Sequence, residues 1–493
     1  MTDSTPATPP RYTEVAAIKT KIVATLGPAS STPELMHALA DAGVDVFRIN
    51  FAHGNQESHG RAVAAIRELS RVLQRPLGLL GDLSGPKIRL GELPDDGFLC
   101  RAGETVEFVR EPTPGRTDQL TCTYERLIDD LQVGDRVLLA DGLVALRVTA
   151  VDRVHGRAAC LVEQPGRVRS RQGVNLPGVA LSTPGITPKD EADLRWALDH
   201  QFDYIGLSFV RSASDIRRLR QLITAHGTAT PPWIVAKIEK TEALDDLENI
   251  LNETDAVMVA RGDLGVEDDI TRVPALQKRI IRLCNERRLP VITATQMLDS
   301  MQQNELPTRA EVSDVANAIL DGTDAVMLSG ETAVGAHPVA AVAMMSRIAR
   351  QAELLAEPRT SSDALLAERS RAKAITEAIT HGAGAAADHL QADLIAVATR
   401  GGKTALALSK QRRKVPIVAL TDSPAIARRM TLFWGVYPVE TSAVASSPSE
   451  QLQFVEQLGR KLGLLKSGSK LVLVGSSDWA QAWHDMLLAH MMA

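Results

Sequence analysis

Two neighbouring apolar runs of this chain end in side chains that can do chemistry together. Lys237 and Glu239 end one run, and Asp263 ends the next. Two carboxylates that leave positions open for water and substrate suit magnesium or manganese rather than zinc. Lys237 lies two residues before Glu239, on the same face of an extended strand, where its ammonium can reach a transferring phosphoryl group or a developing oxyanion. The structural alternatives are a plain Lys237–Glu239 salt bridge and a carboxylate couple neutralised by basic side chains.

Polar residues end other apolar runs in the same way. A charged side chain inside a bundle of strands is costly unless it is paired or bound to an ion. Polar endings on six strands therefore predict one shared active site. Besides the three residues above, these endings are Arg48, Asn50, Asp82, Arg261, Thr295, Gln296, Ser329 and, just beyond it, Glu331.

An anion is the expected ligand of this site. Arg48 and Arg89 can form an anion clamp, and the stretch 260-ARGDLG-265 can offer backbone N–H groups at a helix start. A divalent cation, a lysine, two arginines and a threonine hydroxyl fit a small, highly anionic substrate and phosphoryl transfer. The same set fits a metal-dependent aldolase that holds an enolate. It fits a non-catalytic anion-binding protein much less well.

The polar residues need a frame that brings the ends of the strands together. Eight short apolar runs have the length and β-branched content of buried parallel strands, and amphipathic helical stretches precede most of them, as at 190–200, 241–254, 274–288 and 309–322. Eight repeats of strand and helix predict an α/β fold, a (β/α)8 TIM barrel with its site at the C-terminal ends of the strands. An open sheet of eight strands is the alternative. The runs are 22–27, 44–50, 77–83, 204–210, 233–239, 256–263, 290–296 and 325–330.

Two parts of the chain do not follow the strand–helix repeat. After Asp82, about a hundred residues contain alternating runs at 104–109, 136–140, 143–151 and 158–164, separated by Gly-rich turns. They predict an all-β insert after the third strand, a small barrel placed as a lid over the site, or else a rigid decoration. After about residue 350, strand-like runs at 394–399, 415–420 and 471–475 alternate with helices. They predict a separate C-terminal α/β domain with an open sheet.

Bulk composition excludes several classes of protein. The 493 residues suggest two to four domains, and 44% apolar residues are enough for large cores. A net charge of -5 gives no sign of a nucleic-acid or membrane-surface protein. No run has 18 uninterrupted apolar residues, and the N-terminal stretch has no apolar segment typical of a signal peptide. The four cysteines lie far apart and are interpreted as reduced thiols of a cytoplasmic protein.

Eight motifs together resemble the pyruvate kinase family, from about Lys19 to the C-terminus. The resemblance implies a barrel with a β lid inserted after its third strand, a C-terminal regulatory domain and, usually, a homotetramer. The implied reaction is that of phosphoenolpyruvate and ADP to pyruvate and ATP, a step of glycolysis. The motifs are KTKIVATLGPAS (19–30), FRINFAHG (47–54), GPKIRLG (85–91), GVNLPG (173–178), VAKIEK (235–240), VMVARGDLGVE (257–267), TATQML (293–298) and VMLSGETAVG (326–335).

The resemblance also implies roles for individual residues. Lys237 would steady the phosphoryl group in flight, and Glu239 and Asp263 would hold Mg²⁺ or Mn²⁺. Thr295 would neighbour the carbon that is protonated, by a water chain with Ser329 and Glu331 behind it, because a threonine hydroxyl is a poor acid. The other implied substrate contacts are Arg48, Arg89, Ala260, Gly262 and Asp263. The implied nucleotide contacts are Pro28, Asn50, His53, Arg89, Asp141 and Arg171.

The chain departs from the family where potassium binds in many members. Those members have a glutamate at the position of Lys87, a serine at that of Ala52 and a threonine at that of Leu83. The ammonium of Lys87 can supply covalently the positive charge that potassium brings, with Asp82 close by, so potassium is not expected to be required. The alternative is a solvated Lys87, with potassium bound through Asn50 and Asp82. In the lid, Arg171 keeps one nucleotide-binding charge of the family and Gln172 loses another.

The C-terminal domain contains a candidate effector loop. Glycines, hydroxyls and a lysine at the start of a helix can make a phosphate nest, and in the family this loop binds a sugar-phosphate activator. The stretch after residue 475 lacks the basic, Gly-rich loop expected of members that fructose 1,6-bisphosphate activates, which favours a sugar monophosphate or AMP. An ordinary strand-to-helix turn is the alternative. The loop consists of Thr399, Arg400, Gly401, Gly402, Lys403 and Thr404.

The sequence also suggests domain boundaries and two rival functions. The boundaries are a disordered tail at 1–17, a barrel at 18–85 plus 185–350, a lid at 86–184 and a C-terminal domain at 351–493. One rival is a barrel lyase, which would not need ADP. The other is a catalytically silent sugar-phosphate sensor.

Overall fold

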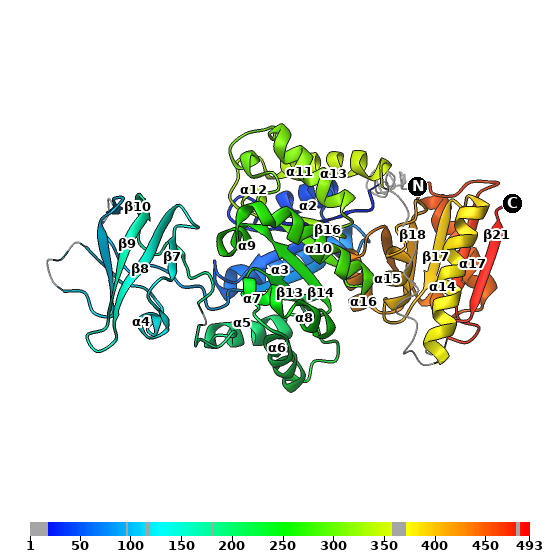
Figure 1. Cartoon of the computed structure of the whole chain (residues 1–493). Helices are drawn as coiled ribbons and strands as arrows, with labels where there is room; N and C mark the ends of the chain where they lie inside the picture. The colour runs from blue at the N-terminus through cyan, green and yellow to red at the C-terminus, as the bar shows by residue number, and fades with distance from the viewer. Residues whose placement is uncertain are drawn as a thin grey trace.

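The computed structural model describes residues 18–94, 97–113, 116, 118–179, 181–356, 371–479 and 484–493. The tail predicted at 1–17 lies outside these ranges. Figure 1 shows three parts in a row, with an all-β part at one end, a barrel surrounded by helices in the middle and an α/β part at the other end.

The middle part is the predicted TIM barrel. Eight parallel strands close in the order β1-β16-β15-β14-β13-β12-β3-β2. Each predicted apolar run overlaps one of them, and almost every strand residue is buried, as expected when both faces of a parallel sheet are covered. The strands are β1 (Lys21–Thr25), β2 (Val46–Asn50), β3 (Gly78–Leu83), β12 (Tyr204–Leu207), β13 (Trp233–Ile238), β14 (Ala256–Ala260), β15 (Val291–Ala294) and β16 (Ala325–Leu328).

The helices around the barrel follow the predicted stretches with one difference. The stretch 241–254 is not one helix, because the chain breaks at Asp246 between α7 and α8. The Asp246 carboxylate accepts hydrogen bonds from the backbone N–H of Ala213 and from the side chain of Asn249, which turns the chain away from helical geometry. The helices are α2 (Pro33–Ala42), α3 (Gln56–Val72), α5 (Pro188–Asp199), α6 (Ala213–His226), α7 (Thr241–Asp245), α8 (Leu247–Glu253), α9 (Arg261–Glu267), α10 (Val273–Glu286), α11 (Arg309–Leu320), α12 (Gly330–Ala333) and α13 (Pro338–Leu354).

The insert after β3 is all-β apart from the short helix α4 (Leu127–Asp130). Among the described residues its strands form a six-stranded sheet, β11-β7-β8-β9-β5-β6, and a two-stranded ribbon, β10-β4. The segment 88–91 pairs with residues at both edges of the six-stranded sheet, with Gly173 just before β11 and with Cys122 just after β6. Register shifts between β8 and β9 bend this sheet. The strands are β4 (Phe98–Cys100), β5 (Thr105–Val109), β6 (Gln119–Leu120), β7 (Arg136–Leu139), β8 (Val144–Asp152), β9 (Arg157–Gln164), β10 (Gly166–Val168) and β11 (Val174–Asn175).

The C-terminal part is an open five-stranded sheet in the order β19-β18-β17-β20-β21, with β21 antiparallel. The sequence predicted β17 (Leu394–Ala398), β18 (Ile417–Thr421) and β20 (Lys470–Gly475) but not the two edge strands. The edge strand β19 (Val436–Glu440) is interrupted by a proline, and β21 (Met486–Met491) is rich in methionine and leucine and has no β-branched residue, so neither has the pattern of a buried strand. The helices of this part are α14 (Arg371–Leu390), α15 (Lys403–Ser409), α16 (Pro424–Arg429) and α17 (Pro448–Lys461).

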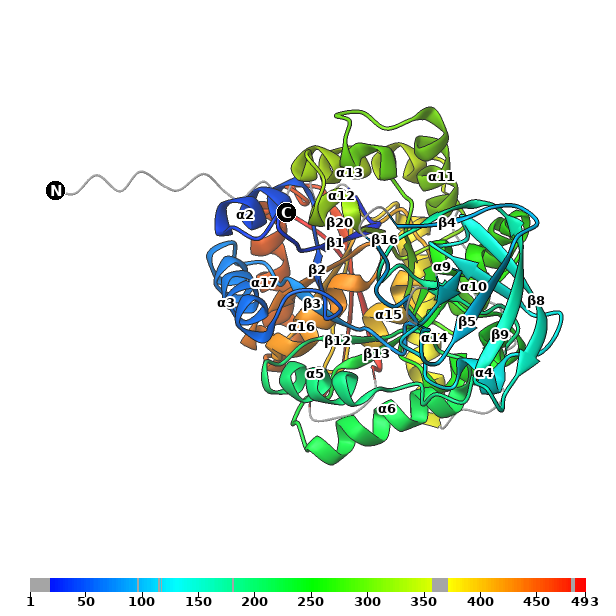
Figure 2. The same ribbon diagram turned by 90° about the vertical axis from the view of Figure 1, so that its left-hand side faces the viewer.

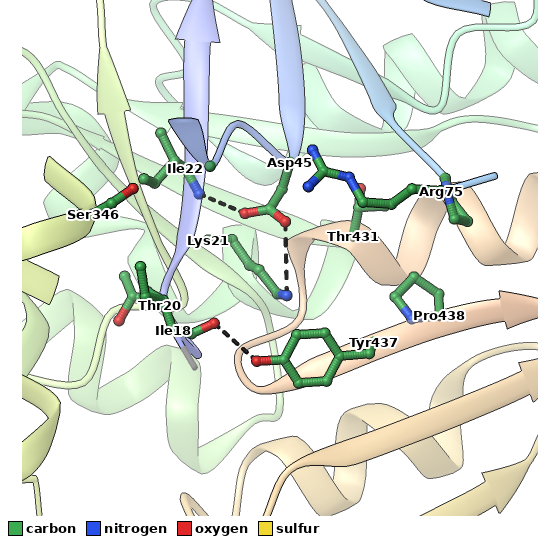
Figure 3. Close-up of a pocket in the computed structure, with 12 residues that line it drawn as sticks. Ile18, Thr20, Lys21, Ile22, Asp45, Arg75, Ser346, Thr431, Tyr437 and Pro438 are labelled. Atoms are coloured by element: carbon green, nitrogen blue, oxygen red, sulfur yellow. Dashed lines mark hydrogen bonds and ion pairs between the residues drawn. The ribbon is translucent and has the colours of Figure 1, made fainter. Parts of the chain in front are cut away.

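The C-terminal part packs on the barrel at the N-terminal ends of the strands. Tyr204 fills the barrel interior in one apolar cluster with Phe433, and its hydroxyl donates to the carbonyl of Arg429. At this junction, which Figure 3 shows, Lys21 lies 3.8 Å from Asp45 and 4.8 Å from the centre of the Tyr437 ring. A cavity of about 30 Å³ lies beside them, enough for about one water molecule.

A buried ionic cluster ties the same junction together. Asp324, just before β16, accepts from Lys410 at 2.6 Å and from Arg412 at 3.0 Å, and all three side chains are at most 4% exposed. Burial by itself raises the pKa of Asp324, but the charges on Arg412 and Lys410 outweigh burial and lower that pKa. Burial lowers the pKa of Lys410 to about 8 despite the carboxylate. The cluster joins the end of α15 to the strand β16.

Two sequence-level expectations about the whole chain can be compared with the structure. All four cysteines are unpaired thiols, and burial raises the pKa of Cys160 and of Cys284 to about 12. In the described part of the chain, every helix is too short or too polar to cross a bilayer.

Candidate active site

The C-terminal ends of the barrel strands bring most of the predicted site residues together. Figure 2 looks toward the lid end of the molecule, where helices surround the strands and the lid lies to one side of them. The lid strands and the barrel meet at α9, because a Cβ atom on Gly142 would lie 3.8 Å from the side chain of Val266. The site is therefore built on barrel strands and reached by residues of the lid.

Lys237 is the centre of a buried polar network. Its ammonium donates to Ser208 Oγ at 2.7 Å and lies 2.9 Å from Glu239 Oε1 and 3.3 Å from Asp82 Oδ2. Burial by itself lowers the pKa of Lys237, but Asp82 and Glu239 outweigh burial and raise it. The lysine is thus held as a cation. It makes the salt bridge to Glu239 that the sequence offered as a structural alternative, and it also lies among the polar residues at the ends of the strands.

Arg48 and Asp82 form the second part of this network. The Arg48 guanidinium donates to Asp82 Oδ2 from Nε at 2.8 Å and from a terminal nitrogen, and its other terminal nitrogen donates to Thr25 Oγ1 at 3.0 Å. Burial raises the pKa of Asp82, but Lys237 and Arg48 outweigh burial and lower it. Asp82 is therefore an ionised carboxylate that orients two cations at the base of the site.

The two predicted metal carboxylates lie at the ends of adjacent strands. Glu239 is fully buried and accepts from the backbone N–H of Phe209 at 2.7 Å, while Asp263, in the first turn of α9, is partly exposed. Burial raises the pKa of Glu239, the Lys237 charge opposes this, and the nearby charge of Asp263 adds to it. Two carboxylates close enough to repel fit a divalent cation, which would relieve that repulsion.

Lys87 lies beside Asp263. The ammonium and Asp263 Oδ1 are 3.7 Å apart, and both side chains are about a third exposed or less. Asp82, which the sequence placed close to Lys87, is engaged by Arg48 and Lys237. The positive charge of Lys87 therefore lies beside Asp263, one of the two predicted metal carboxylates.

Thr295 is hydrogen-bonded to the backbone N–H of Gly262, one of the implied substrate contacts. Its backbone has a φ of 69°, and its Oγ1 accepts from the backbone N–H of Gly262 at 2.7 Å while donating to the carbonyl of Ala294 at 2.6 Å. Arg261, the buried first residue of α9, donates to the carbonyl of Thr295 at 2.8 Å. Because Ala260 ends β14 and Gly262 lies in the first turn of α9, the helix start and the threonine loop face each other.

Ser329 and Glu331 lie behind the threonine loop. The Glu331 carboxylate accepts from the backbone N–H of Leu298 at 3.0 Å and from that of Ser329 at 2.7 Å. It is 1% exposed, and burial raises its pKa. Its hydrogen bonds are thus used to join the loop after β15 to the loop after β16, which gives Glu331 a structural role in this site.

The predicted nucleotide contacts form a looser, more exposed group. Pro28 and His53 are exposed, and Asn50 uses its side-chain oxygen to accept from the backbone N–H of Ala52 at 3.1 Å. In the lid, Arg89 donates to the carbonyl of Arg171 at 3.0 Å. Arg171 itself pairs with Glu92 on the surface, and Asp141, with a φ of 55°, lies at an exposed turn.

Sequence reasoning missed residues that complete the network. Ser208 accepts from Lys237 and donates to the carbonyl of Leu83 at 2.7 Å, and Phe209 supplies an N–H to Glu239 from a backbone with a φ of 54°. The run 204–210 was read as strand throughout, whereas β12 ends at Leu207. Ser208, a polar residue directly after β12, could have been found from the sequence, because polar residues also follow the other apolar runs.

The candidate effector loop lies between β17 and α15. Arg400, Gly401 and Lys403 are exposed, whereas the Thr399 hydroxyl accepts from the N–H of Gly402 at 3.1 Å and is buried. Thr404 bonds to the ring of His484 at 3.0 Å. The two hydroxyls thus shape the loop, and its charged side chains face outward, with Arg400 lying 4.9 Å from the centre of the Trp479 ring.

Comparisons with known proteins follow the same division into parts. Residues 17–342 match the model of the pyruvate kinase barrel domain, and residues 377–486 match that of the pyruvate kinase alpha/beta domain. The chain is 43% identical over 457 residues to a pyruvate kinase of Geobacillus stearothermophilus, covering 92% of this chain and 77% of that protein. It is 42% identical over 461 residues to pyruvate kinase 2 of Synechocystis, covering 93% of this chain and 76% of that one. A crystal structure of a pyruvate kinase from Cryptosporidium parvum superposes with a TM-score of 0.88 at 34% identity, over 98% of this chain and 97% of that one.

Proposed function

The chain belongs to the pyruvate kinase family, and on that premise we propose that it transfers the phosphoryl group of phosphoenolpyruvate to ADP, giving pyruvate and ATP in glycolysis. It is an enzyme of the phosphotransferase class, as the sequence predicted. The observation that carries the reaction is the buried Lys237 ammonium, held between Asp82 and Glu239 beside Arg48. A fixed cation in a nearly dry site is what a moving phosphoryl group requires.

In this mechanism the chain supplies positioning and charge. Glu239 and Asp263 would hold Mg²⁺ or Mn²⁺, which would neutralise charge on the substrate and phosphate oxygens. Lys237 exchanges its carboxylate partners for the phosphoryl oxygens, and Arg48 holds the phosphate from the opposite side. When substrate takes the N–H of Gly262, the Thr295 hydroxyl is released toward the carbon that is protonated. The proton itself comes through water in this proposal, because a threonine hydroxyl is a weak acid.

The lid completes the site for the nucleotide. Arg89, Arg171 and Asp141 are proposed to contact ADP together with Pro28, Asn50 and His53. Closure of the lid would exclude water, which otherwise competes with ADP for the phosphoryl group. The exposure of Pro28, His53, Asp141 and Arg171 supports a group that is assembled only around bound nucleotide.

The first test is the initial rate of pyruvate formation from phosphoenolpyruvate with and without ADP, in the presence of magnesium. We expect strict dependence on ADP. Pyruvate formed without ADP would favour a barrel lyase. No pyruvate under any condition, sugar phosphates included, would favour a catalytically silent sensor.

We further propose that Lys87 replaces potassium. Its ammonium stands 3.7 Å from Asp263, where a fixed positive charge can act on the phosphates. With a built-in cation, the reaction needs no monovalent ion from solution.

For this proposal, the expected result is equal activity of the wild type in potassium and in tetramethylammonium salts. Lys87→Glu places a negative charge beside Asp263, so we expect activity without potassium to fall about a hundredfold, the scale of losing one electrostatic contact in the transition state. Potassium should restore much of it. Initial rates of pyruvate formation in the two salts measure both effects, and Lys87→Arg is the matched control that keeps the charge. A wild type that works only in potassium contradicts the proposal.

The loop at 399–404 is proposed to bind a sugar monophosphate or AMP as an allosteric effector. The outward-facing charges of Arg400 and Lys403, and the open space around Gly401, support a phosphate there. Lys403→Glu reverses one of these charges. It should raise the concentration of glucose 6-phosphate, ribose 5-phosphate or AMP needed for half-maximal activation by about tenfold or more. The reason is that one lost charge-assisted contact is worth about 1.5–3 kcal/mol. Activation curves with each ligand measure this, and an unchanged curve for the ligand that activates the wild type would place its site elsewhere.

The proposal also covers the location of the enzyme, its oligomeric state and its domain boundaries. The enzyme works in the cytoplasm, and it assembles as a homotetramer. Its domains run over 18–85 plus 185–350, 86–184 and 351–493. The separate sheets of the barrel, the insert and the C-terminal part support this division.

A further inference from the structure

A buried polar contact joins the lid to helix α9. Asn175, the last residue of β11, donates from Nδ2 to Glu267 Oε1 at 2.9 Å, and Lys240 Nζ lies 2.7 Å from the same oxygen. All three residues are at most 6% exposed. We call Asn175, Glu267 and Lys240 the lid tie.

On the barrel side, the lid tie is attached to the helix that carries the metal carboxylate. Helix α9 has seven residues, with Asp263 in its first turn and Glu267 as its last residue. The two residues are four apart, so they lie on one face of the helix about 6 Å apart along its axis. A shift of Glu267 therefore moves Asp263 and the N–H of Gly262 with it.

On the lid side, the lid tie is attached to β11, which lies close to predicted nucleotide contacts of the lid. Asn175 follows Gly173, whose backbone pairs with that of Arg89. A Cβ atom on Gly173 would lie 3.2 Å from Asp141 Oδ1 and 3.5 Å from Lys87 Cε. Two charged side chains, Asp141 and Lys87, thus lie beside a residue only two positions before the lid tie.

The hydrogen bonding of the lid tie is incomplete. Glu267 Oε2 and Asn175 Oδ1 are both buried, and neither has a hydrogen-bond partner among the residues that the structure describes. A half-satisfied buried polar network costs more than an apolar contact of the same shape. A cavity of about 20 Å³ lined by Asn175, Lys240 and Lys87 lies beside it, which leaves room for rearrangement. Unpaired buried oxygens and an adjacent cavity make the lid tie a weak source of stability. They are compatible with a contact whose role is to position the lid.

We propose that the lid tie sets the position of the lid relative to α9, so that Asn175 and Glu267 are positioning residues for the reaction. The proposal rests on the proposed function, because it concerns how the lid brings ADP to the phosphoryl group. When the lid tie is intact, the nucleotide contacts of the lid keep a fixed position relative to the metal carboxylate Asp263. When it is broken, the lid still folds but meets ADP in many positions.

The direct test is Asn175→Ala, which removes the lid-side donor and leaves the Lys240–Glu267 ion pair in place. We expect kcat/KM for ADP to fall about tenfold, the size of one buried hydrogen bond to a charged group. KM for phosphoenolpyruvate, whose proposed contacts lie in the barrel except for Arg89, should change less than about twofold by the same reasoning. A loss shared equally by both substrates would overturn the proposal.

A charge swap tests the contact itself. Asn175→Asp places a carboxylate against Glu267, and we expect a larger loss than with Asn175→Ala. The double variant Asn175→Asp with Glu267→Gln restores one donor, one carboxylate and the charge balance with Lys240. It should recover kcat/KM for ADP to within about threefold of the wild type, because coupled partners are not additive. A double variant no better than Asn175→Asp would overturn the proposal.

Amide hydrogen exchange on the full chain without ligands gives a readout that needs no activity. We expect faster exchange in Asn175→Ala at residues 86–90 and 173–179 only, and a return to the wild-type rate in the double variant. Faster exchange throughout the barrel would mean that the contact only stabilises the fold. A wild type that forms no pyruvate would reject the proposed reaction, while the exchange pattern would still decide whether the lid tie controls the lid.

Discussion

Lys237→Met is expected to lower kcat for pyruvate formation about a thousandfold or more, the range found when a fixed charge on a transferring phosphoryl group is removed. The cause lies in the geometry. Lys237 is the one cation that touches both Asp82 and Glu239 in the described network, and methionine keeps its volume without its charge. Steady-state rates at saturating phosphoenolpyruvate, ADP and magnesium measure the effect.

Metal binding separates loss of chemistry from loss of the site. Glu239 keeps the N–H of Phe209 in the variant, and it loses the cation that competes with a metal. Binding of Mn²⁺, followed by electron paramagnetic resonance, should therefore be retained or tightened. Lys466→Met, at an exposed position of the C-terminal domain, is the matched control and should behave as the wild type. Near-full activity of Lys237→Met would show that the proposed mechanism is wrong.

Asp324→Asn is expected to lower the free energy of unfolding by about 3–5 kcal/mol, because it leaves Lys410 and Arg412 buried without a carboxylate. Urea unfolding followed by tryptophan fluorescence measures it at the junction, where Trp434 stacks with Arg412. Asp129→Asn, which breaks an exposed pair with Arg110, is the control and should cost less than about 1 kcal/mol. Equal losses in the two variants would contradict the argument.

The same variant should be partly rescued by alkaline pH. The folded pKa of Lys410, about 8, lies below its ordinary value of 10.5. The unfolded chain therefore holds this proton more tightly than the folded one, and the contribution of Lys410 to stability rises as the pH rises through that window. Without Asp324, which raises this pKa, the proton is lost at a still lower pH. The deficit of Asp324→Asn should thus shrink between pH 6 and 9, whereas it should stay constant if Lys410 remains charged.

Much of the fold could be predicted because its signals are local. Each barrel strand is a short apolar run with a polar end, and that pattern depends only on residues within about seven positions of each other. The strands β19 and β21 were missed because they are half-exposed edges, where packing places few demands on side-chain type. In the insert, alternation predicted the strands, but the bridges from Arg89 to Gly173 and from Leu90 to Cys122 join its sheet edges through a segment with no strand pattern of its own.

The candidate site shows the same limit. Residue types at the ends of strands pointed to Lys237, Glu239 and Asp263 without any knowledge of distance. The lid tie could not be found in this way, because Asn175 and Glu267 are 92 residues apart and each has an ordinary structural reading alone. Lys87 was recognised by its departure from the family, yet its neighbour in space is Asp263, which follows only from how the lid connects to the barrel.

The hydrogen bonds that the site residues make with one another also decide which ligands can enter the site. Lys237, Arg48 and the N–H of Gly262 each already have a partner of the opposite kind from the same chain. A visiting anion therefore gains only the difference between its own contacts and those it displaces. Chloride or bicarbonate, with one diffuse charge, offers no better contact than an Asp or Glu side chain. A ligand that presents a phosphate and a carboxylate together, as the proposed substrate does, can displace all three partners at once, so we expect the network to select it over the common anions of the cell.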